Sequence, residues 1–313
     1  MSGPDPAFLA HQLSVQHQTR QPNLYAAVSV SLFIAYVSVV LRLIARYRMG
    51  QKLLADDYWI IGALFPVTVF DGFNYWSTHA GLGLHIIRIK SIKALIQSSV
   101  ACMATYPLCL PPSKFSILYL YHRLFPSKAI KHISLLIAFV VLGSAIAASV
   151  AFGLQCIPLS SLWTGAPNRC LNLSALSMAT GVLNIVTDVA ILCLPIQPLT
   201  QLQVSTKTRI GVLATFLLGG CVCIISIIRT TVVGQASQED PSWNNAIGGI
   251  WSTIEVHVAI VSANLPVLKP IFMRDSTETS SSHTPASRKP YFHSPTIRYG
   301  RMMTSYRCKT LTT

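Results

Sequence analysis

Charged residues are scarce in this sequence. Of its 313 residues only 11% are charged, and the acidic ones number 10 against 24 basic ones. A soluble globule of this size would need more charge to cover its surface. With 51% hydrophobic residues and a mean hydropathy of +0.50, lipid is the natural solvent, so we expect an integral membrane protein whose first partner is the lipid bilayer.

The basic excess does not indicate a nucleic-acid partner. Although the net charge is +14, the Lys and Arg residues avoid the long apolar runs and gather between and after them. Membrane loops have this distribution, whereas nucleic-acid binding needs a basic face on a folded domain. We therefore expect no nucleic acid among the partners.

Cofactor and enzyme signals are also missing. The last apolar run, 244–268, contains no Lys, and a retinal protein needs one there for its Schiff base, so we expect neither retinal nor another cofactor. No phosphate-binding loop, His-Glu-x-x-His zinc helix or Gly-x-Ser-x-Gly elbow occurs. Cys109, Cys193, Cys221 and Cys223 fall inside apolar runs, where thiols act as small apolar groups, so we expect no metal site. The sequence predicts a protein that is not an enzyme.

Long apolar runs are what the chain does contain. A membrane-spanning helix needs about 20 mostly apolar residues, and this rule selects seven segments: 24–43, 57–78, 96–122, 132–155, 173–196, 208–232 and 244–268. The predicted fold class is an all-α membrane protein, a bundle of seven transmembrane helices.

The basic residues predict the orientation of this bundle. Seventeen Lys and Arg residues fall on one side of the seven runs, with the C-terminus, and five on the other. Because cytoplasmic loops retain positive charge, we place the N-terminus outside and the C-terminus in the cytoplasm. Residues 1–23 are then an extracellular segment and 24–272 the seven-helix domain. Residues 273–313, basic and rich in Ser and Thr, form a cytoplasmic tail that we expect to be disordered.

A polar stripe runs along the fifth apolar segment. Ser177, Gly181, Asn184 and Asp188 recur at intervals of four, three and four residues, which places them on one face of a helix. Lys114 of the third segment lies at the depth of Asp188, and ionisable groups in hydrocarbon usually pair. We interpret this set as a buried polar core, which serves either function or helix packing alone.

Four residues in the outer half of the bundle are candidates for a ligand pocket. Asp71 and Arg229 lie at similar depth, Glu255 lies near the midplane, and Trp251 lies one turn above Glu255. Polar and aromatic groups that converge in this way are typical of a binding site. The alternative is that they only fix helix packing.

Two cysteines flank the predicted outer loop between the fourth and fifth segments. Cys156 and Cys170 lie where disulfides persist, and a bond between them would staple this loop. Cys102, near the outer end of the third segment, is a competing partner for Cys170. Sequence alone leaves the two pairings open.

A series of short motifs resembles one known family. The motifs are, in order, RLIAR (42–46), LADDYWI (54–60), GLGLH (81–85), KFSILYLY (114–121), RLFP (123–126), CxPxxxxW (156–163), NxxxD (184–188), LPI (194–196), LGGCVCIISIIR (218–229) and WSTIE (251–255). Each is weak alone, but their order is specific. The chain resembles the fungal rhodopsin-domain family over about residues 24–272.

The resemblance implies a seven-helix protein of filamentous fungi. It is similar to plasma-membrane receptors for surface cues and to membrane proteins found beside secondary-metabolite genes, and the family name implies neither retinal nor light sensing. We therefore expect a receptor-like protein of the plasma membrane that senses an unknown extracellular ligand and signals to a cytoplasmic protein. The alternatives are a small-metabolite transporter and a structural membrane protein associated with secondary metabolism.

Overall fold

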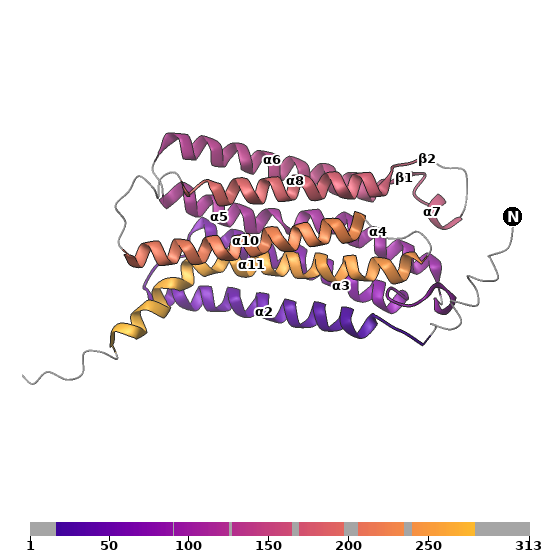
Figure 1. Ribbon diagram of the computed structural model, residues 1–313, viewed down its shortest axis with the longest axis horizontal. Coiled ribbons are helices and arrows are strands. Elements are labelled where there is room, and N and C mark those ends of the chain that lie inside the picture. The colour runs from indigo at the N-terminus through magenta and orange to yellow at the C-terminus, as the bar shows by residue number, and fades with distance from the viewer. Residues whose placement is uncertain are drawn as a thin grey trace, which may run out of the picture. The chain divides into compact units, whose positions relative to one another are not determined.

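A computed structural model describes residues 17–89, 91–124, 127–164, 169–196, 206–234 and 240–278, and these ranges are almost entirely helical (Figure 1). The long helices are α2 (Gln21–Arg48), α3 (Ala55–Ala80), α4 (Ile92–Cys109), α5 (Pro111–Leu124), α6 (Lys128–Gly153), α8 (Leu173–Cys193), α10 (Thr206–Gly234) and α11 (Pro241–Glu278). Two short helices, η1 (Ile86–Arg88) and α7 (Ser161–Thr164), lie in loops. Strands β1 (Cys156–Ile157) and β2 (Arg169–Cys170) form one antiparallel pair.

The predicted terminal segments lie mostly outside the described residues. Of the predicted extracellular segment 1–23, only residues 17–23 are described, and α2 already begins at Gln21. At the other end, α11 continues to Glu278, so the structure is helical where the sequence predicted the start of the tail 273–313. Residues Arg274–Glu278 belong to a separate unit from the bundle.

Five helical stretches within the described part are long and apolar enough to cross a membrane: Gln21–Arg48, Ile92–Leu124, Lys128–Gly153, Leu173–Cys193 and Pro241–Leu268. The all-α membrane class is therefore confirmed. Two predicted spans are not among the five. One is α3, which covers the predicted run 57–78 and carries three Asp residues. The other is α10, which covers the predicted run 208–232; here only Gly219–Gly234 qualifies as an apolar helix, and it is shorter than a full span.

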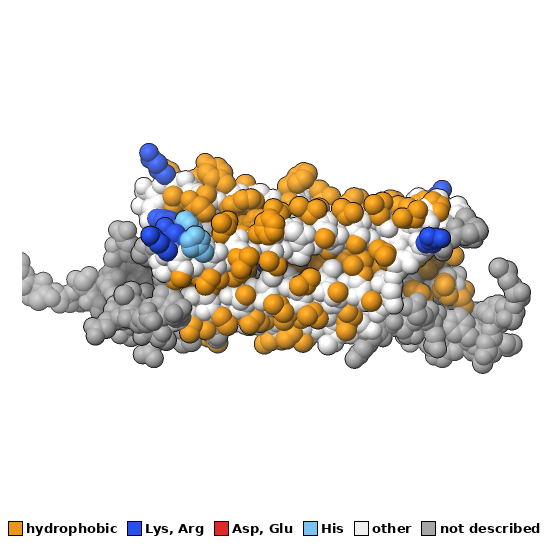
Figure 2. All heavy atoms as spheres, turned by 90° about the horizontal axis from the view of Figure 1, so that it is seen from above, with side chains coloured by type: hydrophobic (Ala, Val, Ile, Leu, Met, Phe, Trp, Pro, Cys, Tyr) orange, Lys and Arg blue, Asp and Glu red, His pale blue; other side chains and the backbone are white. Residues whose placement is uncertain are grey.

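The surface of the bundle is apolar along its length. Phe33, Phe65 and Phe139, from three different helices, are 70%, 77% and 75% exposed. Figure 2 shows hydrophobic side chains spread over the middle of one face, with Lys and Arg side chains near its two ends. An apolar girdle of this kind faces lipid, because in water it would be a large aggregation-prone patch.

The core is built from small and branched side chains. Helix α3 packs against α2, α4 and α5, while α6 packs against α4, α5 and α8. The main cluster contains Ala35, Val39, Ile60, Ala63, Val67, Phe70, Tyr106, Cys109, Val256, Ile260 and Ala263. Small residues at helix contacts let the backbones approach closely, which is how helices associate in lipid.

The third predicted segment is divided in two. The run 96–122 is not one helix but α4 followed by α5, with the break at Leu110. Pro107, Pro111 and Pro112 surround this point, and proline lacks an N–H and clashes with the preceding turn. The break places Lys114 in the first turn of α5.

A buried cluster of two arginines and two aspartates joins α2 to α3. Arg42 contacts Asp56 at 2.5 Å and Asp57 at 2.7 Å, and Arg46 contacts the same carboxylates at 2.7 and 3.1 Å. Asp57 also accepts from the backbone N–H of Leu54 at 3.0 Å, which caps α3. The four charges cancel, so their burial leaves no net charge at this end of the bundle.

Candidate functional site

Lys114 of α5 binds a polar face of α8. Its Nζ lies 2.9 Å from Asp188 Oδ1 and donates to Asn184 Oδ1 at 2.6 Å and to Thr187 Oγ1 at 2.8 Å. The three partners share a face of α8 because they are three and four residues apart. The structure thus brings the predicted buried core, Lys114, Asn184 and Asp188, into direct contact.

Glu255 of α11 extends this network to three more helices. Its carboxylate is fully buried and accepts from Tyr106 Oη of α4 at 2.5 Å and from Asn184 Nδ2 of α8 at 2.9 Å. It also accepts from the hydroxyl of Ser226 of α10, which lies 3.5 Å from Asp188. One carboxylate therefore holds α4, α8, α10 and α11 together.

Arg229 of α10 is the second buried cation. Its Nε lies 3.2 Å from Ser252 Oγ and 3.7 Å from Glu255 Oε2, and its Cζ lies 4.1 Å above the ring centroid of Tyr106. The cation–π contact adds to the attraction by the carboxylate. The ion pair with Glu255 is the looser one, since the pair between Lys114 and Asp188 closes at 2.9 Å.

The network is balanced in charge. Lys114 and Arg229 are matched by Asp188 and Glu255, all at most 9% exposed. Buried charges persist only when they are paired and hydrogen-bonded. Among the described residues, no group of three or more His, Cys, Asp or Glu side chains is placed to hold a metal ion.

A cavity of about 110 Å³ lies beside this network. Its lining comes from α3, α4, α6, α8, α10, α11 and the loop after α3: Phe70, Asn74, Ser77, Leu82, Ser99, Cys102, Met103, Tyr106, Phe152, Ser177, Arg229, Val233, Asn245, Gly248, Gly249 and Ser252. Asn245 and Ser252 are seven residues apart on α11, so the lining runs about 10 Å along the bundle. The cavity lies toward the end where α3 finishes and α11 begins.

Of the four predicted pocket residues, only Arg229 lines this cavity. Glu255 lies behind it, in contact with Tyr106 and Arg229. Trp251 is half-buried and not part of the lining. The reason is rotation: Gly248 and Ser252 of α11 face the cavity, and the residue before Ser252 points about 100° away on an α-helix. This cavity gives no support to Trp251 as a ligand contact, which stays a prediction.

Asp71 belongs to a different pair. Its Oδ2 lies 3.0 Å from Nε2 of His257, whose Nδ1 contacts the backbone oxygen of Thr253 at 2.7 Å and Ser31 Oγ at 3.2 Å. This contact joins α3 to α11 and α2. Asp71 is not part of the lining of the 110 Å³ cavity, so its role in ligand binding stays a prediction, and His257 is a partner that sequence reasoning missed.

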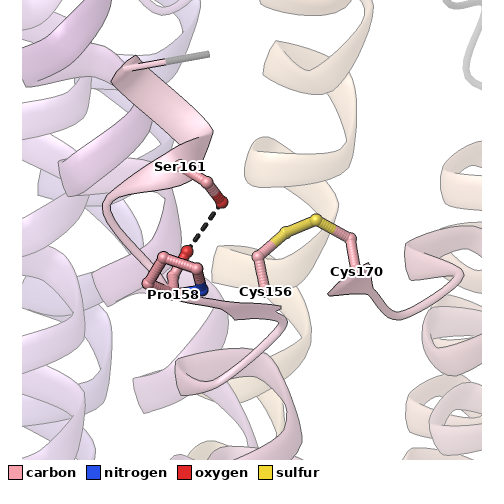
Figure 3. Close-up of a disulfide and its surroundings, with 4 residues drawn as sticks. All are labelled: Cys156, Pro158, Ser161 and Cys170. Atoms are coloured by element: carbon pink, nitrogen blue, oxygen red, sulfur yellow. Dashed lines mark hydrogen bonds between the residues drawn. A yellow bond between two sulfur atoms is a disulfide. The ribbon is translucent and has the colours of Figure 1, made fainter. Parts of the chain in front are cut away.

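Of the two possible pairings, the disulfide between Cys156 and Cys170 is formed, in the loop between α6 and α8 (Figure 3). The two residues face each other as partners in the β1–β2 pair. After β1 the chain turns, and Ser161 Oγ donates to the backbone oxygen of Pro158 at 2.6 Å. Cys102, the competing partner, is a free thiol that lines the cavity.

A cluster of polar and aromatic side chains, the cap, joins the loop after α3 to the start of α11. Arg20 lies 4.1 Å above the ring of Trp243 and donates to its backbone oxygen at 2.9 Å. The ring of His85 stacks on the ring of Trp243, with 4.2 Å between the two ring centroids. His85 Nδ1 lies 2.7 Å from Asp240 Oδ2. Burial lowers the pKa of Arg20, and the charge of Asp240 partly offsets this. Leu82 of the same loop lines the cavity, so the cap and the cavity lie at the same end of the bundle.

Comparison with known proteins places these features in a family. The family model of the fungal rhodopsin domain matches residues 41–274. Over 282 residues the chain is 26% identical to "Polyenoic acids biosynthesis gene cluster protein Ba17b" of Metarhizium anisopliae, which covers 84% of this chain and 77% of that protein. No solved structure matches the chain.

Two further relatives match over less of their own length. The chain is 32% identical over 167 residues to "SAT4 family membrane protein" of Emericella nidulans, covering 52% of this chain and 42% of that protein. It is 22% identical over 263 residues to "Receptor GIN3" of Arthrobotrys oligospora, covering 81% and 63%. Because the family match extends over three quarters of the sequence, the chain belongs to the fungal rhodopsin domain family.

Proposed function

We propose that this chain is a receptor-like membrane protein that senses an extracellular cue without retinal and signals to a cytoplasmic partner. The observation that carries the proposal is the contact between a cavity and a buried charge network. Arg229 lines the cavity and touches Glu255, which binds side chains of α4, α8 and α10. One relative is named a receptor, and another is named for a biosynthesis gene cluster.

The proposed topology has seven spans, with α3 and α10 added to the five clearly apolar stretches. The N-terminus lies outside and the C-terminus in the cytoplasm of a protein in the plasma membrane. The distribution of Lys and Arg supports this orientation, and so does the Cys156–Cys170 bond, which suits the oxidising side. In this topology the cavity and the cap lie at the outer end of the bundle.

The proposed mechanism is a shift in helix positions. A ligand that draws the guanidinium of Arg229 toward the cavity lengthens its 3.7 Å contact with Glu255. Glu255 then redistributes its hydrogen bonds among Tyr106, Asn184 and Ser226, which belong to three helices. A ligand shifts such an equilibrium only by its difference in affinity for the two states, and contact with Arg229 supplies that difference.

The test uses Arg229→Gln and Glu255→Gln in a strain deleted for the chain's own gene. Each variant is first shown to reach the plasma membrane, and growth and transcripts are compared with the deletion and wild-type strains. Arg48→Gln, at an exposed position at the end of α2, is the matched control. We expect both buried-site variants to reproduce the deletion phenotype and the control to behave as wild type. Wild-type behaviour of both would refute a sensing role for this site.

Transport of a small metabolite is the second candidate. A smaller cavity of about 50 Å³ includes Tyr106, Lys114 and Asn184 in its lining, so Tyr106 separates two cavities that both touch the charge network. A transporter with a gate at Tyr106 would use both. In that case Glu255→Gln would change the amount of a metabolite retained in cells, measured by mass spectrometry of cells and medium, without the transcript response.

We also propose that the chain is not an enzyme, because its sequence carries none of the catalytic motifs named above.

A further inference from the structure

The guanidinium of Arg229 is buried but only partly used. Its side chain is 8% exposed, and its polar contacts with Ser252 and Glu255 both involve Nε. Within the described part of the chain, neither Nη atom makes a hydrogen bond. A buried cation with unmatched N–H groups is costly, so these groups mark a place for an acceptor that the protein itself does not supply.

The unused N–H groups belong to a side chain that lines the 110 Å³ cavity. Phe70, Met103 and Phe152 give the cavity an apolar wall, and Tyr106 holds the guanidinium from the other side. An engineered cavity of about 150 Å³ accommodates benzene. The space beside Arg229 is smaller than that, so it suits a molecule with no more heavy atoms than benzene, with a short apolar body and one polar end.

The Nη groups of Arg229 favour an anionic end, although the network as a whole is balanced in charge. Glu255 is the nearest carboxylate to Arg229, but it lies 3.7 Å away and already accepts from Tyr106, Asn184 and Ser226. Its negative charge is thus already stabilised by three other hydrogen-bond donors. A planar carboxylate fits the fork of two Nη groups and forms charge-assisted, paired hydrogen bonds there.

We propose that the cavity binds a small carboxylic acid in its carboxylate form, with the carboxylate on the Nη groups of Arg229 and the apolar body against Phe70, Met103 and Phe152. The inference rests on the proposed receptor function, since it names the chemical class of the ligand for the same cavity. Arg229 Nε donates to Ser252 Oγ at 3.2 Å, which fixes the orientation of the guanidinium beside the cavity.

The test measures binding to the purified full chain in lipid nanodiscs. The probes are propionate and butyrate, each compared with its neutral amide, by saturation-transfer NMR and competition. We expect saturable binding of at least one acid, at least about tenfold tighter than its amide, because a charge-assisted hydrogen bond contributes more than a neutral one. Binding of neither acid, or equal binding of acid and amide, would overturn the proposal.

Two variants locate the binding. Arg229→Gln should weaken binding of the acid by at least about tenfold and leave binding of the amide unchanged. Met103→Trp should fill the cavity and abolish binding of both, and it keeps the charge network intact if Arg229→Gln fails to fold. Acid binding that survives Met103→Trp would place the ligand elsewhere and refute the inference.

The outcome is separable from that of the proposed function. If the acids bind through Arg229 and the Arg229→Gln strain grows and transcribes as wild type, the ligand class stands and the sensing role fails. If the strain reproduces the deletion phenotype and no acid binds, the sensing role stands and the ligand class fails.

Discussion

Removing one member of the pair between Lys114 and Asp188 should cost far more than removing both. In Lys114→Met, Asp188 loses the cation at 2.9 Å and keeps only a long contact of 3.5 Å with Ser226. An uncompensated buried charge typically costs about 3–5 kcal/mol. In the double variant with Asp188→Leu no charge is left unpaired, and its free energy of unfolding should lie within about 1–2 kcal/mol of wild type.

The measurement is a double-mutant cycle on purified protein in dodecyl maltoside, unfolded with SDS and followed by far-ultraviolet circular dichroism. We expect a coupling free energy of at least about 4 kcal/mol between the two positions, because each single loss is about 3–5 kcal/mol and the loss in the double variant is at most about 2 kcal/mol. Lys128→Met is the control, because Lys128 is exposed at the start of α6. It should change stability by less than about 0.5 kcal/mol. Additive losses in the double variant would refute the reasoning that the two charges are buried as a pair.

Two further predictions concern helix packing and the outer loop. In Gly181→Ala the new Cβ would lie 2.5 Å from Thr230 Oγ1 and 3.2 Å from its Cβ, so α8 and α10 must separate. We expect the free energy of unfolding to fall by about 1–3 kcal/mol in the same assay. The control is Gly143→Ala, whose new Cβ would have nothing within 4 Å and which should be neutral or stabilising by up to about 1 kcal/mol. Equal effects of the two substitutions would contradict the packing of α8 against α10. Cys156→Ser should cost about 3 kcal/mol for a loop of this length and leave Cys170 open to a membrane-impermeant maleimide on intact cells; no labelling would argue against an outward-facing disulfide.

The contact between Lys114 and α8 was within reach of sequence reasoning. The stripe that includes Asn184 and Asp188 follows from helical periodicity alone, and depth along the bundle is proportional to residue number. Both quantities are properties of single helices. The residues that share a height and an inward face therefore meet, as Lys114 and Asp188 do at 2.9 Å.

The contacts of α11 could not be predicted from the sequence. The position of a residue along a helix gives its depth in the bundle, but not the direction in which its side chain points around the helix axis. Trp251 and Glu255 have the expected heights, but only Glu255 faces the network. The pairing of Asp71 with His257 depends on which face of α11 packs against α3. The spacing of polar residues along one helix does not predict which neighbouring helix that face meets. Asp240 and Trp243 likewise meet His85 across more than 150 residues of chain. Glu255 and Arg229 were found as intramembrane charges, whereas Tyr106, which touches both, carries no charge to mark it.

The cluster of Arg42, Arg46, Asp56 and Asp57 also bears on how the chain enters the membrane. Helix α3 carries three carboxylates and fails the apolarity expected of an independent span. Two of them are neutralised by arginines of α2, at contacts no longer than 3.1 Å. Helices α2 and α3 therefore depend on each other as a helical hairpin, because neither partner of the cluster can be buried alone. A chain whose α2 lacked both arginines would carry two unpaired buried carboxylates at the start of α3, even though every later helix kept its own sequence.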